Sequence, residues 1–201
     1  MTTKIDKEVT IKTKIMGILN ITPDSFSDGG QFADELKALK RVEQMQKEGA
    51  DIIDIGAESS RPGANPISIQ EEIKRLKPIL KKIKQATSLP ISLETYKPEV
   101  AEFALQYKID WINDITGLAN KKMVQIVAKN NLTAVMMHMD KNPLTMQQNP
   151  QYDDVVKMIK EWMKKRIHQL TKKGIKKLIL DPGIGFGKSV KHNIQLIQKV
   201  N

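Results

Sequence analysis

Residues 52–83 read IIDIGAESSRPGANPISIQEEIKRLKPILKKI, and this stretch contains one complete unit of the fold. The apolar run Ile52–Gly56 is continuous rather than alternating, which is typical of a strand covered on both faces in a parallel sheet. A loop containing Pro62 and Gly63 follows it. After Ser68, apolar residues recur at helical spacing along one face: Ile69, Ile73, Leu76, Leu80 and Ile83. The stretch therefore predicts a strand, a loop and a helix in that order.

The same unit recurs along the chain. Five more apolar runs are predicted as strands: Ile15–Asn20, Leu89–Leu93, Trp111–Ile115, Thr133–His138 and Leu178–Asp181. Helical periodicity returns between them, and Gly49 and Gly174 are predicted to end two of the helices. Strands that alternate with helices indicate an α/β fold with a parallel sheet. Six strands fit either an open sheet or a (β/α)8 barrel lacking two units, since a closed barrel needs eight strands and about 250 residues.

Composition narrows the class of protein. The 201 residues suit a single domain, and the absence of cysteine excludes disulfides and thiolate metal sites. No apolar run is long enough for a membrane span, and the N-terminus lacks a secretory pattern, so a cytoplasmic protein is expected. The net charge of +10 comes mainly from lysines on helical stretches, without interleaved aromatics. A solvated lysine surface is therefore expected, and neither nucleic acid nor a membrane is predicted as a partner.

Polar side chains stand at or near the carboxyl ends of the predicted strands. They are Asn20, Asp54, Glu94, Asn113, Asp114, His138 and Asp181. Any one of them could simply begin a turn or cap a helix. Because the carboxyl ends of parallel strands share one edge, the set predicts a site for a hydrogen-bond-donating, partly cationic ligand. His138 is expected to be a core residue rather than a ligand-binding one.

Three loops carry further candidates. The glycine-rich segment 181–189 is not a nucleotide P-loop, because Pro182 stands where that motif needs a glycine, and its glycine spacing does not match the dinucleotide fingerprint either. It is expected to bring backbone close to a flat ligand. Arg61 in segment 56–63 is either an anion clamp or an exposed loop arginine. The long, turn-rich segment 20–30 carries Phe26.

Five segments together resemble the dihydropteroate synthases of the pterin-binding barrel family. They are MGILNITPDSFSDGG (16–30), DIGAESSRPG (54–63), WINDI (111–115), MHM (137–139) and LDPGIGFGK (180–188), and they occur in family order. The resemblance implies a single pterin-binding domain over residues 1–201 with the TIM-barrel fold, of which about six of the eight βα units are present. It also implies a transferase that joins 6-hydroxymethyl-7,8-dihydropterin diphosphate to 4-aminobenzoate and releases pyrophosphate.

The resemblance also implies roles for individual residues. Asn20 matches the ligand of a Mg²⁺ cofactor, and Asp24 and Arg61 match residues near the reacting atoms. The implied substrate-binding positions are Phe26, Asp54, Ser60, Arg61, Pro62, Glu94, Asn113, Asp181 and Phe186. Phe26 and Pro62 match the wall of the aminobenzoate pocket.

The chain departs from the family pattern at several points. Glu94 stands where the family's S-I-D-T motif has aspartate, and Ala57 and Ser60 replace glycine and threonine. The S-R-K and R-x-H motifs of the seventh and eighth strands should lie downstream of Asn201. Without them, the 201 residues alone are expected to show little turnover and to aggregate, and the family's homodimer is expected only for a complete chain. A non-catalytic pterin-binding protein and a related methyltransferase are the alternatives; the loops at 22–28 and 58–63 favour the synthase.

Overall fold

A computed structural model describes residues 13–22 and 30–199. Six parallel strands form one sheet in the sequential order β1-β2-β3-β4-β5-β6. Their bounds are β1 Met16–Asn20, β2 Ile52–Gly56, β3 Ile91–Glu94, β4 Trp111–Asp114, β5 Thr133–Met137 and β6 Leu178–Asp181. All six predicted strands are therefore confirmed. The largest difference is at β3, which begins and ends later than the apolar run Leu89–Leu93.

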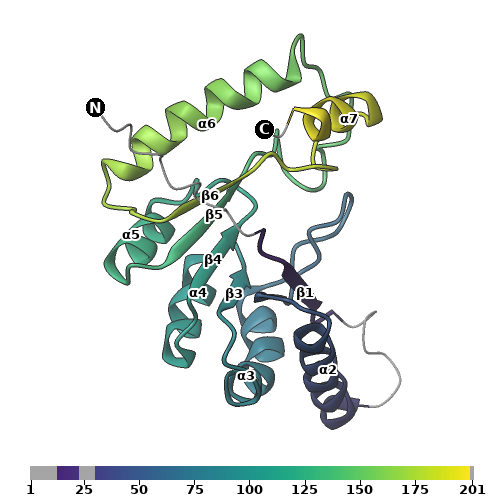
Figure 1. Cartoon of the computed structure of the whole chain (residues 1–201), viewed down its shortest axis with the longest axis vertical. Helices are drawn as coiled ribbons and strands as arrows, with labels where there is room; N and C mark the ends of the chain where they lie inside the picture. The colour runs from purple at the N-terminus through teal and green to yellow at the C-terminus, as the bar shows by residue number, and fades with distance from the viewer. Residues whose placement is uncertain (1–12, 23–29, 200–201) are drawn as a thin grey trace, which may run out of the picture.

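Helices follow the strands and surround the outer side of the curved sheet (Figure 1). They are α2 Gly30–Lys47, α3 Ile69–Ala86, α4 Pro98–Ala104 with the short 3₁₀ helix η1 Leu105–Tyr107, α5 Lys121–Lys129, α6 Val155–Thr171 and α7 Val190–Gln198. The Ser68 hydroxyl accepts a hydrogen bond from the Glu71 amide at 3.1 Å and so caps α3. Gly49 and Gly174 follow their helices with φ values of +97° and +90°, as their predicted role requires.

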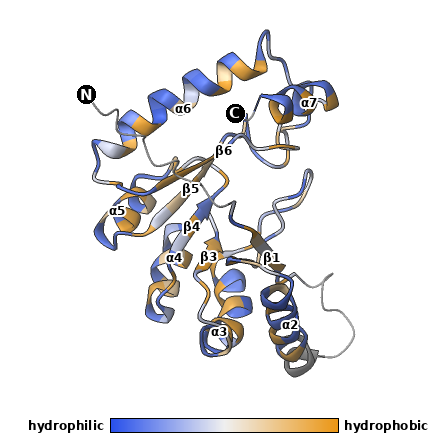
Figure 2. Cartoon of the chain, in the orientation of Figure 1, coloured by the Kyte–Doolittle hydropathy of each residue, from blue (hydrophilic) through white to orange (hydrophobic). Residues whose placement is uncertain are grey.

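The main core lies between the outer face of the sheet and the helices. Ile53, Leu93 and Ile112 project outward from β2, β3 and β4 and are fully buried beneath helical residues such as Leu76 and Ile83. The helices carry apolar and polar residues on different sides, whereas β6 is largely apolar (Figure 2). Burial of this face is what holds the strands in their order.

The inner face of the sheet is less covered. Ile18 on β1 and Ile179 on β6 are 59% and 40% exposed, and within the described residues these two edge strands pair on one side only. The described part of the chain is thus an open sheet rather than a closed barrel. None of the helices in that part is both long and apolar enough to cross a lipid bilayer.

Candidate active site

Four aligned residues form a row across the carboxyl end of the sheet. Asn20, Gly56, Glu94 and Asn113 are register partners on β1, β2, β3 and β4. Aligned residues of neighbouring parallel strands point to the same side, so all four lie on the inner face. Asp54, two residues before Gly56, shares this face. The register thus brings four of the predicted site residues to one side of the sheet.

A hydrogen bond across β3 confirms that these side chains meet. Asn113 Nδ2 donates to Asp54 Oδ2 at 3.0 Å, although β2 and β4 are not neighbours. Ser92, the register partner of Asp54, lies between them and is fully buried. Burial raises the pKa of Asp54, and the nearby Ser92 and Asn113 partly offset this effect. Asp54 Oδ1 and Ser92 Oγ are both buried, and Ser92 lies close enough to lower the pKa of Asp54.

Glu94 and Asn20 converge over Gly56. A Cβ on Gly56 would lie 3.0 Å from Glu94 Oε2 and 3.5 Å from Asn20 Oδ1, so the absence of a side chain at position 56 leaves room for both. Burial, and then the charge of Asp54, raises the pKa of Glu94 to about 7, while a hydrogen bond with Ser60 acts in the opposite direction. Glu94 is therefore close to half-protonated at neutral pH.

The segment after β2 carries the predicted anion-binding residues. Ser60 is partly buried and lines a small cavity together with Glu94. Arg61 and Pro62 are exposed at the tip of the segment, and the Gly63 amide donates to the Pro143 carbonyl at 3.1 Å. The structure thus places Ser60 beside the inner row and Arg61 at the rim, where its guanidinium is accessible to an anion.

The glycine-rich segment after β6 is fixed by two close contacts. Asp181 Oδ1 accepts from the Gly183 amide at 2.7 Å, and a Cβ on Gly183 would come within 2.1 Å of the His138 carbonyl oxygen. Lys188 is buried and donates to the carbonyls of His138 and Phe186 at 3.1 and 2.8 Å. Its ammonium is therefore used within the protein, which agrees with the exclusion of a phosphate-binding P-loop.

Comparison with known proteins shows which family the chain belongs to. The model of the family described as pterin binding enzyme matches residues 16–201. The dihydropteroate synthase of Haemophilus influenzae is 46% identical over 190 residues, which cover 94% of this chain and 69% of that protein.

The chain belongs to the pterin-binding enzyme family.

Solved structures agree with this assignment. A Yersinia pestis dihydropteroate synthase in complex with a sulfonamide drug has a TM-score of 0.86 and 39% identity, covering 96% of this chain and 72% of that one. A Xanthomonas albilineans dihydropteroate synthase with 4-aminobenzoic acid has a TM-score of 0.85 and 39% identity, covering 93% and 67%. The pterin-binding enzyme described here is a transferase of the dihydropteroate synthase type, and its open sheet is part of the TIM-barrel fold.

Not every polar residue near a strand end belongs to the site of this pterin-binding enzyme. Asp114 is fully buried on the opposite face, where it accepts from the amide and hydroxyl of Thr116 at 2.8 and 2.6 Å. Its prediction as part of the shared mouth is wrong, because consecutive strand residues point to opposite faces. Asp54 lies inside β2 rather than at its end. His138 packs edge-on against Trp162 with centroids 5.0 Å apart, which confirms it as a core residue.

Two predicted site residues lie outside the described part of the chain, and two residues of the site were not predicted. Asp24 and Phe26 lie outside the described residues, so their placement stays a prediction. Ser92 and Gly56 were not singled out as site residues from the sequence. Their positions two residues before Glu94 and two after Asp54 in neighbouring strands could have indicated a shared face.

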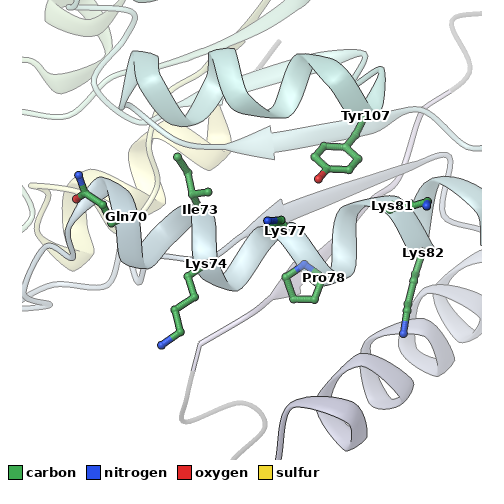
Figure 3. Close-up of a pocket in the computed structure, with 8 residues that line it drawn as sticks. All are labelled: Gln70, Ile73, Lys74, Lys77, Pro78, Lys81, Lys82 and Tyr107. Carbon is green, nitrogen blue, oxygen red and sulfur yellow. The ribbon is translucent and has the colours of Figure 1, made fainter.

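A second hollow lies away from this site, on the outer side of α3. It measures about 750 Å³ and is lined by Gln70, Ile73, Lys74, Lys77, Pro78, Lys81, Lys82 and Tyr107. The labelled lysine side chains point in different directions instead of toward one point, and Lys82 reaches Glu35 of α2 (Figure 3). This arrangement is that of a solvated lysine surface, as the sequence predicts, and it adds nothing to the inner-face chemistry.

Proposed function

We propose that the inner row binds 6-hydroxymethyl-7,8-dihydropterin diphosphate and that the chain joins this substrate to 4-aminobenzoate, the dihydropteroate synthase reaction of folate biosynthesis. The observation that carries the proposal is the Asp54–Asn113 contact across β3, which holds a carboxylate and an amide side by side on the inner face of the sheet. Relatives have been solved with both kinds of ligand: the Thermus thermophilus enzyme is described with 6HMPPP and with 4-aminobenzoate.

The buried acceptors suit the edge of a pterin ring. That edge presents several N–H donors, and a carboxylate has about four acceptor sites, so Asp54 can accept from a pterin in addition to Asn113. A buried acceptor without a donor is costly, by about 1–3 kcal/mol, so a ligand that supplies the donor gains that amount of binding free energy. Asn113 holds Asp54 in place and adds an amide oxygen to the same recognition surface.

Asn20 fits the role of a magnesium ligand. Its amide oxygen is a hard donor at the exposed end of β1, close to Glu94. No group of three His, Cys, Asp or Glu that could hold a metal occurs among residues 13–22 and 30–199. Mg²⁺ prefers a few protein oxygens completed by phosphate oxygens and water, and the Asn20 amide oxygen can supply one of them. Mg²⁺ bound there would neutralise negative charge on the diphosphate.

The chemistry then follows from where charge develops. The bond between the substrate's methylene carbon and the diphosphate oxygen breaks, so positive charge develops on the pterin side and pyrophosphate leaves. Asp54, held by Asn113, stabilises that positive charge electrostatically. The aniline nitrogen of 4-aminobenzoate forms the new bond to carbon and releases one proton. Arg61 at the rim is placed to hold anionic oxygens of either substrate.

Binding and turnover of the chain test this proposal. Calorimetric titration with the dihydropterin diphosphate and Mg²⁺ should show binding that Asp54→Asn weakens at least tenfold, with Lys74→Ala on the distant α3 surface as the matched control. Chromatographic detection of dihydropteroate from both substrates tests the reaction. Pterin binding without product would support the non-catalytic alternative. Unchanged pterin affinity in Asp54→Asn would overturn the proposed site.

A further inference from the structure

An ion-pair cluster lies directly behind the proposed site. Lys97 comes three residues after Glu94, and its ammonium contacts the Glu58 carboxylate, Glu72 Oε2 at 2.7 Å and the Ile67 carbonyl at 2.8 Å. The side chains of Lys97, Glu58 and Glu72 are only 12%, 11% and 1% exposed. All bonding directions of the ammonium are thus used inside the protein, so Lys97 is not placed to contact a substrate itself.

The Glu58 carboxylate accepts two further hydrogen bonds from different parts of the chain. The Tyr96 hydroxyl donates to Glu58 Oε1 at 2.6 Å, and the Ile67 amide donates to Glu58 Oε2 at 2.9 Å. Lys97 therefore joins both ends of segment 58–67, one through the Glu58 carboxylate and the other through the Ile67 carbonyl. The segment is a closed loop whose two ends meet at one buried ammonium.

The part of the segment between these two ends carries Ser60, Arg61 and Pro62. A cavity of about 10 Å³, large enough for one water molecule at most, is lined by the Ser60 and Glu94 side chains and by Glu58 and Glu72 of the cluster. The anchor and the proposed site are therefore adjacent. At the start of the segment, Arg75 adds a hydrogen bond to the Ala57 carbonyl at 3.0 Å.

We propose that Lys97 is a positioning residue, which fixes segment 58–67 so that Ser60 lies beside the inner row and Arg61 lies at its rim. What the segment then holds, an anionic oxygen of substrate, rests on the proposed function. Removal of the ammonium leaves Glu58 and Glu72 facing each other without a counter-charge, and their repulsion opens the loop. Among the described contacts, Asp54 and Asn113 form no hydrogen bond with the cluster, so their recognition of the pterin ring does not depend on it directly, whereas Glu94 borders the cluster in the shared cavity.

Hydrogen exchange of the full chain, followed by mass spectrometry without ligand, tests the positioning step. In Lys97→Met, amides of segment 58–67 should exchange at least tenfold faster, while β4 and β5 remain unchanged. Lys97→Arg should restore most of the protection because it keeps the charge. Lys122→Met is the matched control, since Lys122 makes exposed ion pairs with Glu99 and Glu102. Unchanged exchange at 58–67 in a folded Lys97→Met would overturn the inference.

Ligand binding tests the consequence. With Mg²⁺ and the dihydropterin diphosphate present, Lys97→Met should bind 4-aminobenzoate at least tenfold more weakly, while its affinity for 6-hydroxymethyl-7,8-dihydropterin, which has no diphosphate for Arg61 to hold, should fall less than threefold. An equal loss of both affinities would overturn a role confined to the segment. If Lys97→Met does not fold, Tyr96→Phe can replace it, because it removes a single hydrogen-bond donor from Glu58. This variant should show smaller increases in exchange at 58–67 and a smaller loss of 4-aminobenzoate affinity. Unchanged exchange and affinity in Tyr96→Phe would also overturn the inference.

The two proposals fail in different ways. Faster exchange at 58–67 in a chain that binds neither ligand supports the anchor and overturns the proposed function. Normal pterin binding with no change in exchange or in aminobenzoate affinity overturns the anchor and leaves the proposed function standing.

Discussion

Burial, and then the neighbouring charge of Asp54, governs the pKa of Glu94 in the inner row. Glu94 lies next to Asp54 in a partly buried place, and its pKa is raised to about 7 from an ordinary value of 4.5. Protonation of Glu94 relieves both its desolvation and its repulsion with Asp54. The folded protein therefore binds a proton at Glu94 more tightly than the unfolded chain does.

Stability should consequently fall as pH rises. A carboxyl group whose pKa is raised in the folded state stabilises the fold below pH 4.5 and loses this contribution as pH rises through about 7. Glu94→Gln cannot ionise, so it should match the parent chain near pH 4.5 and exceed its stability at pH 8, by about 3 kcal/mol at most. Urea unfolding at both pH values measures the difference. Exposed Glu99→Gln is the control, and an equal effect at both pH values would contradict the prediction.

Glu94→Asp tests whether the longer side chain is needed for the pterin. The shorter carboxylate restores the family's usual residue at this position. We expect pterin affinity in the presence of Mg²⁺ to stay the same or improve, as measured by calorimetry. A loss of more than tenfold would instead show that glutamate is adapted to this site.

At the level of elements, the turn after β6 depends on a missing side chain. Gly183 has a φ of +68°, and a Cβ there would come within 2.1 Å of the His138 carbonyl oxygen. The close approach of this turn to the end of β5 fixes the direction in which Asp181 and Phe186 leave the sheet.

Gly183→Ala should therefore destabilise the protein by about 3 kcal/mol through overpacking and backbone strain. Gly185→Ala is a matched control, because its φ is +86° but nothing lies within 4 Å of its added Cβ. The control should cost only about 1 kcal/mol. Thermal unfolding followed by circular dichroism compares the two, and equal losses would show that the contact with His138 is unimportant.

For the whole molecule, the inner face is both the proposed site and an incompletely covered surface. Ile18 and Ile179 are exposed on the edge strands, and Ile194 and Ile197 of α7 are 51% and 61% exposed. Exposed apolar side chains beside unpaired strand edges favour association between chains.

We therefore expect the 201-residue chain to self-associate as its concentration rises. Sedimentation velocity over a hundredfold concentration range should show growing assemblies. The double variant Ile18→Lys, Ile179→Lys should shift this onset to higher concentration, because charges at strand edges oppose pairing. Lys74→Glu on the distant α3 surface is the control. A chain that stays monomeric throughout would contradict this prediction.

Sequence patterns alone determined the order and the approximate bounds of the elements. The six apolar runs became six parallel strands, and Gly49 and Gly174 act at helix ends as expected, because periodicity and left-handed glycines are local properties of the chain. The family resemblance likewise rested on contiguous segments. Glu94, Asn113 and Asp181 lie at or next to the carboxyl ends of strands, and Ser60 follows one, so their approach to one edge could be anticipated from the parallel order.

Only the tertiary structure decided which side chains share a face and which hold one another. The sequence groups Asp114 with Asn113, but successive side chains of a strand point to opposite faces of the sheet. Asp114 therefore points into the outer core. Lys97 and Glu58 are 39 residues apart, and no local pattern links them. Their contact depends on the register of β2 against β3 and on the packing of α3, which arise from burial of the whole sheet rather than from any single segment.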